Sequence, residues 1–583
     1  MCSGHRPMRG LAVCAAAVSY AMAGLPGAAW AQPADLSPDA AIQEGLRRQE
    51  ERNRQQQQQL EPRADTLRPA PAALPDGQLP EEAPCFVVQE VRLEGADWQR
   101  LSWLQEAALP YLRQCVGVQG LSRIAAGLDK KLLDLGFATT RVSLPAQNLQ
   151  TGVLRIQLHV GRVADIRLVE PEPRWGTWRN AFPVSRGDVL NIRDLEQGVE
   201  QMKRLPSQNV ATKLEPGAEP DTTVVVIERR AGTLRERLRG GVTLDNSGSP
   251  SLGRTQFSGN LALDNPLGLN DLVSVSLSSN LEKPDPSHRS QSLGLNYSLP
   301  WGYNTFSLSA SQSRFAQYVQ GTTVRFLSSG RSESAELRLQ RTVLRTGSAK
   351  LSLYGSLSLR RAESFLDDVE LLVQRRRTTN VETGLNYRHL FAQASLDLDL
   401  GYRRGMPWQH AQDDLLTAAQ GGATLRPRIW TFGASYATAF KLGAESAAPR
   451  QVQFSSSLRG QHTRDTTLSI DQLAIGGRSS VRGFDGDAVL IAENGVIWRN
   501  ELSTPFKLAP GVDTTGYLGL DWGRVWGPSD VALVGKKLAG AAVGLRGRQA
   551  GLQYDISLAA PLYRPQGFRT RQWNLYATLT YPF

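Results

Sequence analysis

A glycine-rich segment in the C-terminal half of the chain holds the arginine with the most specific chemical requirement. The segment reads Ile475-Gly-Gly-Arg-Ser-Ser-Val-Arg-Gly-Phe-Asp-Gly486, and its glycines permit tight turns with positive φ. Arg482 lies between Val481 and Gly483 and is followed by the apolar Phe484. Because a guanidinium does not lose its charge by releasing a proton, a buried arginine needs a carboxylate partner.

The segment Leu520-Asp521-Trp522-Gly523 offers that carboxylate. Successive side chains of a strand point to opposite faces, so Asp521 points away from Trp522. If Trp522 faces lipid, Asp521 faces the interior and can accept two hydrogen bonds from Arg482. The residues alone leave a second interpretation open, in which Arg482 is an exposed loop arginine in solvent.

Residues 1–31 have the layout of a secretory signal peptide. Two arginines, Arg6 and Arg9, precede an apolar stretch that runs from Leu11 to Leu25. Ala29-Trp30-Ala31 then provides small residues at a cleavage site. A membrane anchor is the alternative, but serine, glycine and proline interrupt the stretch, which is also short. We therefore expect the chain to be exported.

Export would leave Cys85 and Cys115 as the cysteines of the mature chain, because Cys2 and Cys14 lie in the removed segment. The simplest expectation is a disulfide that closes a loop of 30 residues. Two unlinked thiols are the alternative. The pair lacks the C-x-x-C spacing of redox motifs, and six scattered histidines offer no zinc-ligand pattern.

Composition excludes two broad classes of protein. Hydrophobic residues make up 41% of the 583 residues, charged residues 21%, and the mean hydropathy is −0.31. A helical membrane protein needs several apolar runs of about 20 residues, and wholesale disorder needs fewer apolar residues. The net charge of +11 is compatible with nucleic acid, anionic lipid or a wide polar channel, so it decides little.

Residues 32–62 are expected to form a helix, from about Asp35 to Leu60, that is polar on almost all sides. Such a helix must lie in water or in a polar cavity, or else it does not fold stably. A proline-rich, extended linker is expected at residues 63–84. Composition alone favours a disordered tail over a helix lodged in a polar pore.

Two small α/β modules are expected next, at residues 85–163 and 164–231. Both show short strands around an apolar-periodic helix, which is typical of a tandem repeat. The helices are expected at Leu101–Cys115, with a kink or break at Pro110, and at Leu121–Leu135 and Ile192–Leu205. The strands are expected at Phe86–Leu93, Thr140–Leu144, Val153–Val160, Asp165–Val169, Asn209–Leu214 and Thr222–Ile227.

Residues 232–583 alternate between apolar and polar residues in segments of about ten, separated by turn residues. A soluble β-sandwich would also alternate. A closed membrane barrel explains the length better, since roughly 20–24 residues per strand and turn give about 14–18 strands. The last strand ends on the aromatic Phe583. This ending resembles the C-terminal signal of outer-membrane barrels, which implies the barrel-assembly machinery as a partner.

Several motifs together resemble those of the outer-membrane assembly and translocation superfamily. Ser480-Val481-Arg482-Gly483-Phe484 is similar to its loop-tip motif, although some relatives have tyrosine in place of Phe484. The segments Asp245-Asn246-Ser247-Gly248, Asp264–Asp271 and Arg499-Asn500-Glu501-Leu502 are similar to those of its two-partner secretion transporters. Cysteines corresponding to Cys85 and Cys115 occur in only part of that family.

The resemblance implies an all-β transmembrane barrel of about 16 antiparallel strands, preceded by two polypeptide-transport-associated (POTRA) modules and an N-terminal plug helix. It implies that the loop around residues 474–490 folds into the lumen. There Arg482 would pair with Asp521 of an inner-wall Asp-x-Gly motif that ends at Gly523. It also implies that the helix in residues 32–62 occupies the pore, which reverses the expectation from composition.

The function implied by this resemblance is secretion across a bacterial outer membrane. POTRA modules in the periplasm would capture an unfolded exported partner, and the barrel would pass it to the surface. The expected cargo is a large haemolysin, adhesin or contact-dependent-inhibition toxin. A barrel-insertion factor of the same superfamily and a plain diffusion porin are the alternatives. No nucleotide-binding or hydrolase motif is present, so we expect no enzyme activity, cofactor, metal or nucleic-acid partner.

Overall fold

The computed structural model describes part of the chain, and these residues belong to one compact unit within residues 38–583. The described residues are 45–49, 51–52, 66–68, 79–169, 175–249, 251–282, 284–320, 324–414, 422–443, 450–509 and 512–583. The expected signal peptide and most of the expected plug helix and linker lie outside them.

The first module packs helices against a small three-stranded sheet of order β2-β5-β4. Helix α4 buries Ile124, Leu128 and Leu132 in the module's core, which explains its apolar stripe. It ends just before Gly136, whose φ of +97° is a conformation that glycine adopts at little cost. The elements are β1 Phe86–Val87, β2 Glu90–Glu94, α3 Trp103–Ala108, β3 Cys115–Val116, α4 Val118–Asp134, β4 Arg141–Ser143 and β5 Val153–His159.

The expected helix Leu101–Cys115 breaks at Pro110, as expected, but it is wrong in extent because it does not reach Cys115. Helix α3 stops at Ala108, and a short 3-10 turn, η2, spans Leu109–Tyr111 around Pro110. Cys115 itself lies in strand β3, where it is the register partner of Val87 in β1. The proline ends the α-helix, and strand pairing beside the cysteine then sets the backbone.

The second module repeats the plan with a sheet of order β6-β8-β7 and one helix. Strands β6 and β8 are parallel, and β7 and β8 are antiparallel. Helix α5 begins at Asn191, whose side chain accepts a hydrogen bond from the backbone N–H of Arg193. The elements are β6 Arg162–Val169, α5 Ile192–Lys203, β7 Gln208–Pro216, β8 Thr222–Ala231 and the short α6 Leu234–Arg237.

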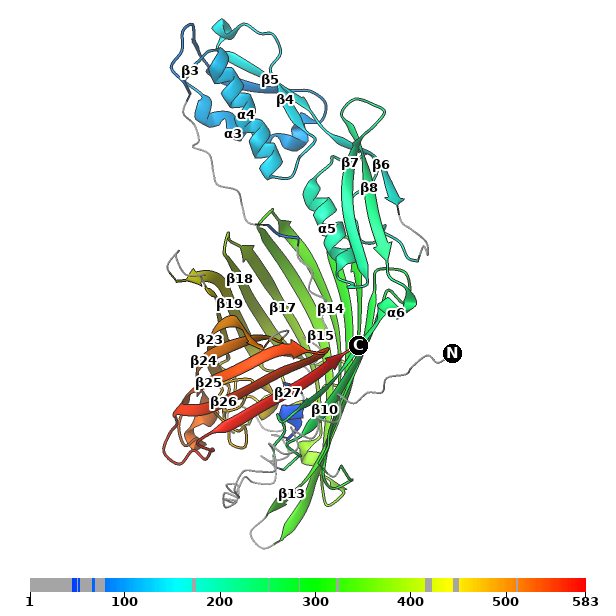
Figure 1. The fold of residues 1–583 in the computed structure, drawn as a ribbon, viewed down its shortest axis with the longest axis vertical. Helices are drawn as coiled ribbons and strands as arrows, with labels where there is room; N and C mark the ends of the chain where they lie inside the picture. The colour runs from blue at the N-terminus through cyan, green and yellow to red at the C-terminus, as the bar shows by residue number, and fades with distance from the viewer. Residues whose placement is uncertain are drawn as a thin grey trace. The chain divides into compact units, whose positions relative to one another are not determined.

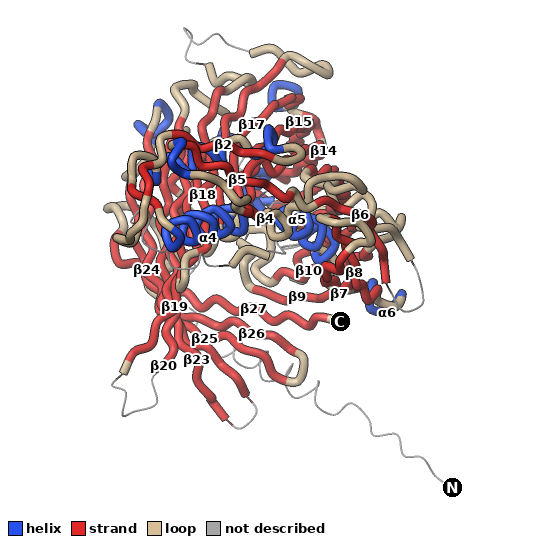
Figure 2. The backbone as a smooth tube through the Cα atoms, turned by 90° about the horizontal axis from the view of Figure 1, so that it is seen from above, coloured by secondary structure: helices blue, strands red, loops and turns tan. Residues whose placement is uncertain are grey.

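The remaining strands form a closed antiparallel barrel, and sixteen strands complete it within the described residues. The expected barrel is therefore confirmed. Strands β23 to β27 run side by side in both views (Figures 1 and 2). The strands are β9 Leu238–Asp245, β10 Gln256–Asp264, β11 Leu272–Asn280, β12 Arg289–Trp301, β13 Asn304–Gln320, β14 Arg325–Arg345, β15 Ala349–Leu366, β17 Arg376–Leu390, β18 Ala394–Met406, β19 Arg428–Leu442, β20 Arg450–His462, β23 Asn494–Ala509, β24 Val512–Trp526, β25 Lys537–Gln549, β26 Leu552–Tyr563 and β27 Asn574–Pro582.

Alternation along each strand separates an apolar outer wall from a polar inner wall. On β24, Leu518 and Leu520 are about half exposed, whereas Tyr517 and Asp521 are buried. Three short pieces lie outside this pattern: β16 Val369–Glu370 pairs with the end of β15 in antiparallel orientation, and β21 Leu473–Ile475 pairs with β22 Leu490–Ala492. The remaining 3-10 turns are η1 Trp98–Leu101, η3 Leu149–Thr151, η4 Leu372–Gln374, η6 Ser469–Asp471 and η7 Pro528–Ala532.

Strands β27 and β9 close the barrel, and Phe583 lies at this junction. The backbone N–H of Phe583 donates to the carbonyl of Gly240 at 2.9 Å, and the N–H of Gly240 donates back to Phe583 at 2.9 Å. A Cβ at Gly240 would lie 2.6 Å from the ring of Phe583, so the close approach of this ring requires glycine there.

Candidate functional site

The loop between β20 and β23 holds the predicted tip residues on a short hairpin. Strands β21 and β22 form its base, with Ile475 opposite Leu490. At the turn, the hydroxyl of Ser480 accepts from the backbone N–H groups of Gly476 and Gly477, each at 3.1 Å. This local bonding presents residues 481–484 to the inner barrel wall.

Arg482 and Asp521 form a two-pronged ion pair on that wall. Nε of Arg482 lies 2.7 Å from one carboxylate oxygen of Asp521, and Nη2 lies 2.7 Å from the other. The backbone N–H of Arg482 donates to the same carboxylate at 2.9 Å. Arg482 is 6% exposed and Asp521 4%, so the interpretation of Arg482 as an exposed loop arginine is wrong.

A second carboxylate, from Glu501 on β23, completes the surroundings of Arg482. Nη1 of Arg482 donates to Glu501 at 2.8 Å, and Nη2 also donates to the backbone carbonyl of Asn500 at 3.0 Å. The other oxygen of Glu501 lies 2.7 Å from Nη2 of Arg546 on β25. Glu501 belongs to the motif Arg499-Asn500-Glu501-Leu502, but its residue type and spacing alone did not predict a contact with Arg482. The available signal was the alternation along this strand. Glu501 lies on the same face as Arg499, and the apolar Leu502 lies on the opposite face.

Val481 and Phe484, the apolar residues of the tip, lie in a buried cluster between the loop and the wall. Both side chains are 0% exposed. The ring of Phe484 meets that of Phe568 edge to face, with centroids 5.7 Å apart. Val481 packs with Ile475 and Val525 in the same cluster. Apolar burial therefore holds the tip on both sides of its one charged residue.

Glycines on the wall let the tip come close. A Cβ at Gly519 would lie 2.3 Å from the guanidinium carbon of Arg482, and one at Gly540 would lie 1.8 Å from its carbonyl oxygen. At Gly523, the predicted motif glycine, a Cβ would lie 2.9 Å from Val481. Gly483 has a φ of +110°, which disfavours any other residue. Gly519 and Gly540 were missed because only strand register brings them to the tip.

Strand β27 supports the backbone of the tip. The side-chain amide of Asn574 donates to the carbonyl of Gly483 at 2.7 Å. The hydroxyl of Tyr576 accepts from the N–H of Gly483 at 3.1 Å and donates to the carbonyl of Phe484 at 2.7 Å. The buried backbone groups of the tip thus have partners on the wall.

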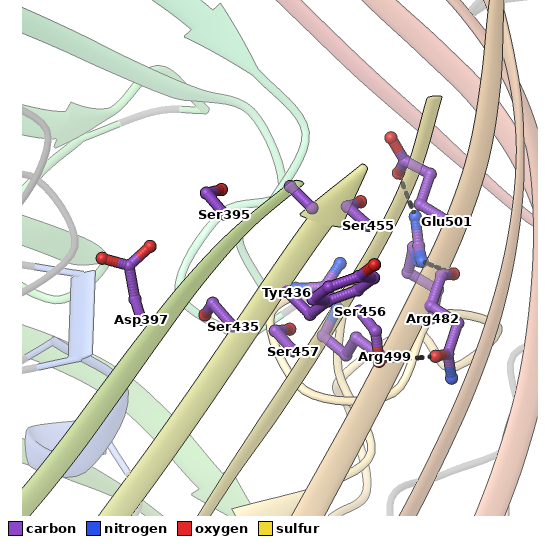
Figure 3. A pocket seen from close by; sticks show the side chains of 12 residues that line it. Ser395, Asp397, Ser435, Tyr436, Ser455, Ser456, Ser457, Arg482, Arg499 and Glu501 are labelled. Atoms are coloured by element: carbon purple, nitrogen blue, oxygen red, sulfur yellow. Dashed lines mark hydrogen bonds and ion pairs between the residues drawn. The ribbon is translucent and has the colours of Figure 1, made fainter. Parts of the chain in front are cut away.

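A polar cavity of about 270 Å³ opens beside the ion pair (Figure 3). Arg482, Arg499 and Glu501 line it from the loop and β23. The neighbouring strands β20, β19 and β18 continue the lining with small hydroxyl side chains. These are Ser395, Ser435, Ser455 and Ser457.

Residues 45–49 and 51–52, the described part of the expected plug, are helical and contact inner-wall residues. Gln49 is 0% exposed, and its side-chain oxygen accepts from Ser290 at 2.8 Å and from Arg52 at 2.6 Å. Leu46 packs with Phe315 and Ala362 of the barrel. The polar side chains of this helix therefore find partners that a lipid or apolar environment would not supply.

In the first module, the structure joins Cys85 to Cys115, with Cα atoms 5.3 Å apart. Nearby, the carboxylate of Glu82 accepts from the backbone N–H groups that begin helix α4, at 2.9 Å from Gly117, 2.9 Å from Gln119 and 2.7 Å from Gly120. Desolvation acts to raise the pKa of Glu82, but these three hydrogen bonds outweigh it and hold the pKa below its ordinary value.

Two kinds of feature are not found in the part of the chain that the structure describes. No group of three or more histidine, cysteine, aspartate or glutamate residues there is arranged to hold a metal ion. No helix among those residues combines the length and apolarity needed to cross a membrane.

Family models match three consecutive parts of the chain. Residues 86–161 match the ShlB-type POTRA domain, and residues 162–216 match a second POTRA domain model. Residues 221–547 match the model described as haemolysin secretion/activation protein ShlB/FhaC/HecB. The last match covers more than half of the chain and most of the barrel.

Individual relatives agree with these matches. The chain is 36% identical over 534 residues to the outer membrane transporter CdiB-2 of Burkholderia pseudomallei, covering 88% of this chain and 89% of that protein. It is 28% identical to the hemolysin transporter protein ShlB of Serratia marcescens, covering 77% of each. The solved structure of CdiB from Escherichia coli has a TM-score of 0.80 at 30% identity and covers 94% of this chain and 100% of that one. The chain therefore belongs to the haemolysin secretion/activation ShlB/FhaC/HecB family, whose members are two-partner secretion transporters that export partner proteins through the bacterial outer membrane.

Proposed function

We propose that the POTRA modules of this transporter capture an unfolded exported protein in the periplasm and that the protein then crosses the membrane through the barrel lumen. The observation that carries the proposal is the polar cavity beside the Arg482–Asp521 pair, inside a closed barrel. A closed barrel leaves no strand edge in lipid, and a polar inner wall lets a peptide backbone stay hydrated.

The POTRA sheets offer edge strands for capture. In the order β6-β8-β7, strands β6 and β7 each have one side without a partner in that sheet. An extended chain can add to such an edge through main-chain hydrogen bonds, which make little demand on sequence. This mode suits an unfolded cargo, whose backbone groups are free to pair.

The helix that includes residues 45–49 and 51–52 would occlude the lumen between transport events. Gln49 and Arg52 bond to Ser290 on the wall, while the side chain of Arg48 reaches the carbonyl of Asp487 at 3.4 Å. These bonds join the helix to both the barrel and the inward loop. Because each can be replaced by water, the helix can leave the lumen at a moderate cost.

The loop tip has a structural role in this proposal and no catalytic one. Arg482, Asp521 and Glu501 would hold the loop against the β23–β24 wall, which keeps the space beside β18 to β20 open for the cargo. No P-loop sequence is present, and folding of the cargo outside the cell would supply directionality.

The names of the relatives support a proposal for the cargo class. Because the chain is similar to transporters named CdiB and ShlB, we propose a large toxin or adhesin of the contact-dependent-inhibition or haemolysin type. Outer-membrane lipid and the barrel-assembly machinery, which would recognise the strand ending at Phe583, are the other proposed partners.

Co-expression tests the proposal. The transporter is produced together with the large exported protein encoded beside it, and the medium and cell surface are assayed for that protein. We expect the cargo outside the cell only when the transporter is present. Cargo that reaches the surface equally well without the transporter would contradict the proposal.

Occlusion has its own test in planar bilayers. Deletion of residues 32–62 should raise the single-channel conductance of the purified transporter, since the described part of this segment contacts the inner wall. Unchanged conductance would show that the segment does not block the lumen.

A further inference from the structure

Arg345, at the end of strand β14, is the buried cation at which three parts of the chain meet. Its side chain is 1% exposed although it lies beside a turn at the barrel rim. Nη1 donates to Glu200 at 2.8 Å and to Gln197 at 2.9 Å, both on helix α5 of the second POTRA module. Nη2 donates to the hydroxyl of Thr66, in the linker that follows the helix of residues 45–49 and 51–52, which we call the lumenal helix.

The linker touches the same turn a second time. The backbone N–H of Arg68 donates to the carbonyl of Gly347 at 2.8 Å, and Leu67 between these contacts is buried. Residues 66–68, which we call the rim segment, are therefore bonded to the barrel through the side chain of Thr66 and the backbone N–H of Arg68. Arg345 supplies the side-chain contact.

Charge balance makes the position of α5 important for Arg345. A guanidinium remains charged when buried, so it depends on nearby carboxylates. Glu200 is shared between Arg345 and Lys350, whose ammonium lies 2.6 Å away. Glu196 lies 3.8 Å from Arg345 and also pairs with Arg193 at 2.9 Å. All the carboxylates paired with Arg345 in the described residues come from α5.

The network continues from α5 into the first POTRA module. The side chain of Arg193 donates to the carbonyl of Asp134, the last residue of helix α4, at 3.3 Å. The side-chain amide of Asn191 donates to the carbonyl of Leu135 at 3.2 Å, and the backbone N–H of Ile192 donates to the carbonyl of Gly136 at 2.8 Å. A shift of either module would therefore displace the start of α5.

We propose that Arg345 is a positioning residue that couples the second POTRA module to the rim segment, and through it to the lumenal helix. The planar fork of an arginine fixes the directions of its N–H groups relative to one another. Movement of Glu200 away from Nη1 therefore reorients Nη2 and breaks the bond to Thr66. Capture of cargo on the module would in this way loosen the linker and favour departure of the helix from the lumen.

This inference rests on the proposed occlusion of the lumen, and it goes beyond it by naming the link to the POTRA module. Thr66 and Glu200 bond to different nitrogens of Arg345, so a change at one reaches the other through that side chain. A double-mutant cycle between the two residues isolates this coupling.

The test is the fraction of time that single channels of the full-length protein spend open in planar bilayers. Thr66→Val keeps the side-chain shape but removes the hydroxyl, and a lost hydrogen bond to a charged group corresponds to about a ten-fold rise in open fraction. Glu200→Gln, a change in the POTRA module alone, should also raise the open fraction. In the Glu200→Gln background, Thr66→Val should then add less than two-fold.

Glu228→Gln is the matched control, because Glu228 lies on β8 of the same module in an exposed pair with Lys213. It should leave the open fraction unchanged, and heat-dependent gel mobility should show an intact barrel in every variant. Equal effects of Thr66→Val in both backgrounds, or no effect of Glu200→Gln, would overturn the coupling. Deletion of residues 32–62 separates the two ideas: if it opens the channel while Glu200→Gln does not, the occlusion stands and the coupling fails.

Discussion

Arg482 and Asp521 face each other with two parallel hydrogen bonds of 2.7 Å, formed between an inward loop and the barrel wall. The residues lie 39 positions apart, and both are more than nine-tenths buried. Leaving one member of such a pair without the other costs about 3–5 kcal/mol. The pair therefore holds the loop in one position only while both partners are present.

Replacement of Arg482 by alanine should reduce cargo secretion at least ten-fold while the barrel still inserts. The variant removes both hydrogen bonds that the guanidinium donates to the buried carboxylate of Asp521 and leaves Arg499, at 3.6 Å, as its nearest cation. The expected cost exceeds the ~1.4 kcal/mol of a ten-fold change. Asp521→Ala should act in the same direction. The measurement is the amount of cargo in the medium relative to the amount of transporter in the outer membrane.

Arg375→Ala provides the control, because Arg375 forms a partly exposed, two-pronged pair with Glu370 on the β15–β17 connection. Exposed pairs contribute about 0–1 kcal/mol, so secretion should stay near the wild-type level. Wild-type secretion by both Arg482→Ala and Asp521→Ala would remove the proposed role of the pair.

Alanine at Gly540 should also impair secretion, although it changes no charge. Its Cβ would lie 1.8 Å from the carbonyl oxygen of Arg482, a backbone atom that cannot move aside without displacing the loop. Gly355→Ala on β15 is the matched variant, since nothing lies within 4 Å of its Cβ. Equal secretion by the two alanine variants would show that the loop does not need this close approach.

Glu82→Gln should loosen the start of helix α4 at neutral pH. The folded pKa of Glu82 is depressed, so its ionised form stabilises the folded state above the unfolded pKa of about 4.3. That contribution is lost as the pH falls through the folded pKa. Hydrogen-exchange protection of the Gly117 and Gly120 amides should therefore differ between wild type and variant at pH 7 and converge in acid.

The neighbouring Glu81→Gln is the control for that experiment, because no hydrogen bond joins Glu81 to α4 in the described structure. It should leave the protection of those amides unchanged at both pH values. A Glu82→Gln variant with wild-type protection at pH 7 would contradict the capping role.

The Cys85–Cys115 disulfide should leave no free thiol in the mature, unreduced protein, and reduction should destabilise the first module. In the loop-entropy model, a crosslink across 30 residues raises the free energy of the unfolded chain by about 3–4 kcal/mol. Thiol labelling after denaturation measures the first outcome, and denaturant unfolding with and without reductant measures the second. Two labelled thiols per mature chain would refute the bond.

Patterns local to the sequence predicted the class of fold and the main elements. Alternation over residues 232–583 predicted the barrel, and the apolar stripe of Leu121–Leu135 predicted α4, which runs from Val118 to Asp134. Strand parity alone placed Asp521 on the face opposite Trp522. These features depend on residues close together in the chain, where periodicity determines which side is buried.

Contacts set by register between distant strands could not be predicted in this way. Glu501 reaches Arg482 because β23 pairs with β24, and Gly540 does so because β24 pairs with β25. Arg345 gave no sequence signal, since its partners come from α5 and from residue 66. The prediction that a helix extends to Cys115 was wrong for a similar reason, because the pairing of β1 with β3 overrides the local apolar pattern.

Site-specific cross-linking of cargo inside the barrel tests the central claim most directly. A photoreactive residue at Ser455, which lines the cavity beside Arg482, should capture a cargo stalled during export. The same residue at Leu502, exposed on the apolar outer wall, should capture none. Cross-links from Ser455 alone would support passage through the lumen; none from Ser455, or equal yields from both positions, would contradict it.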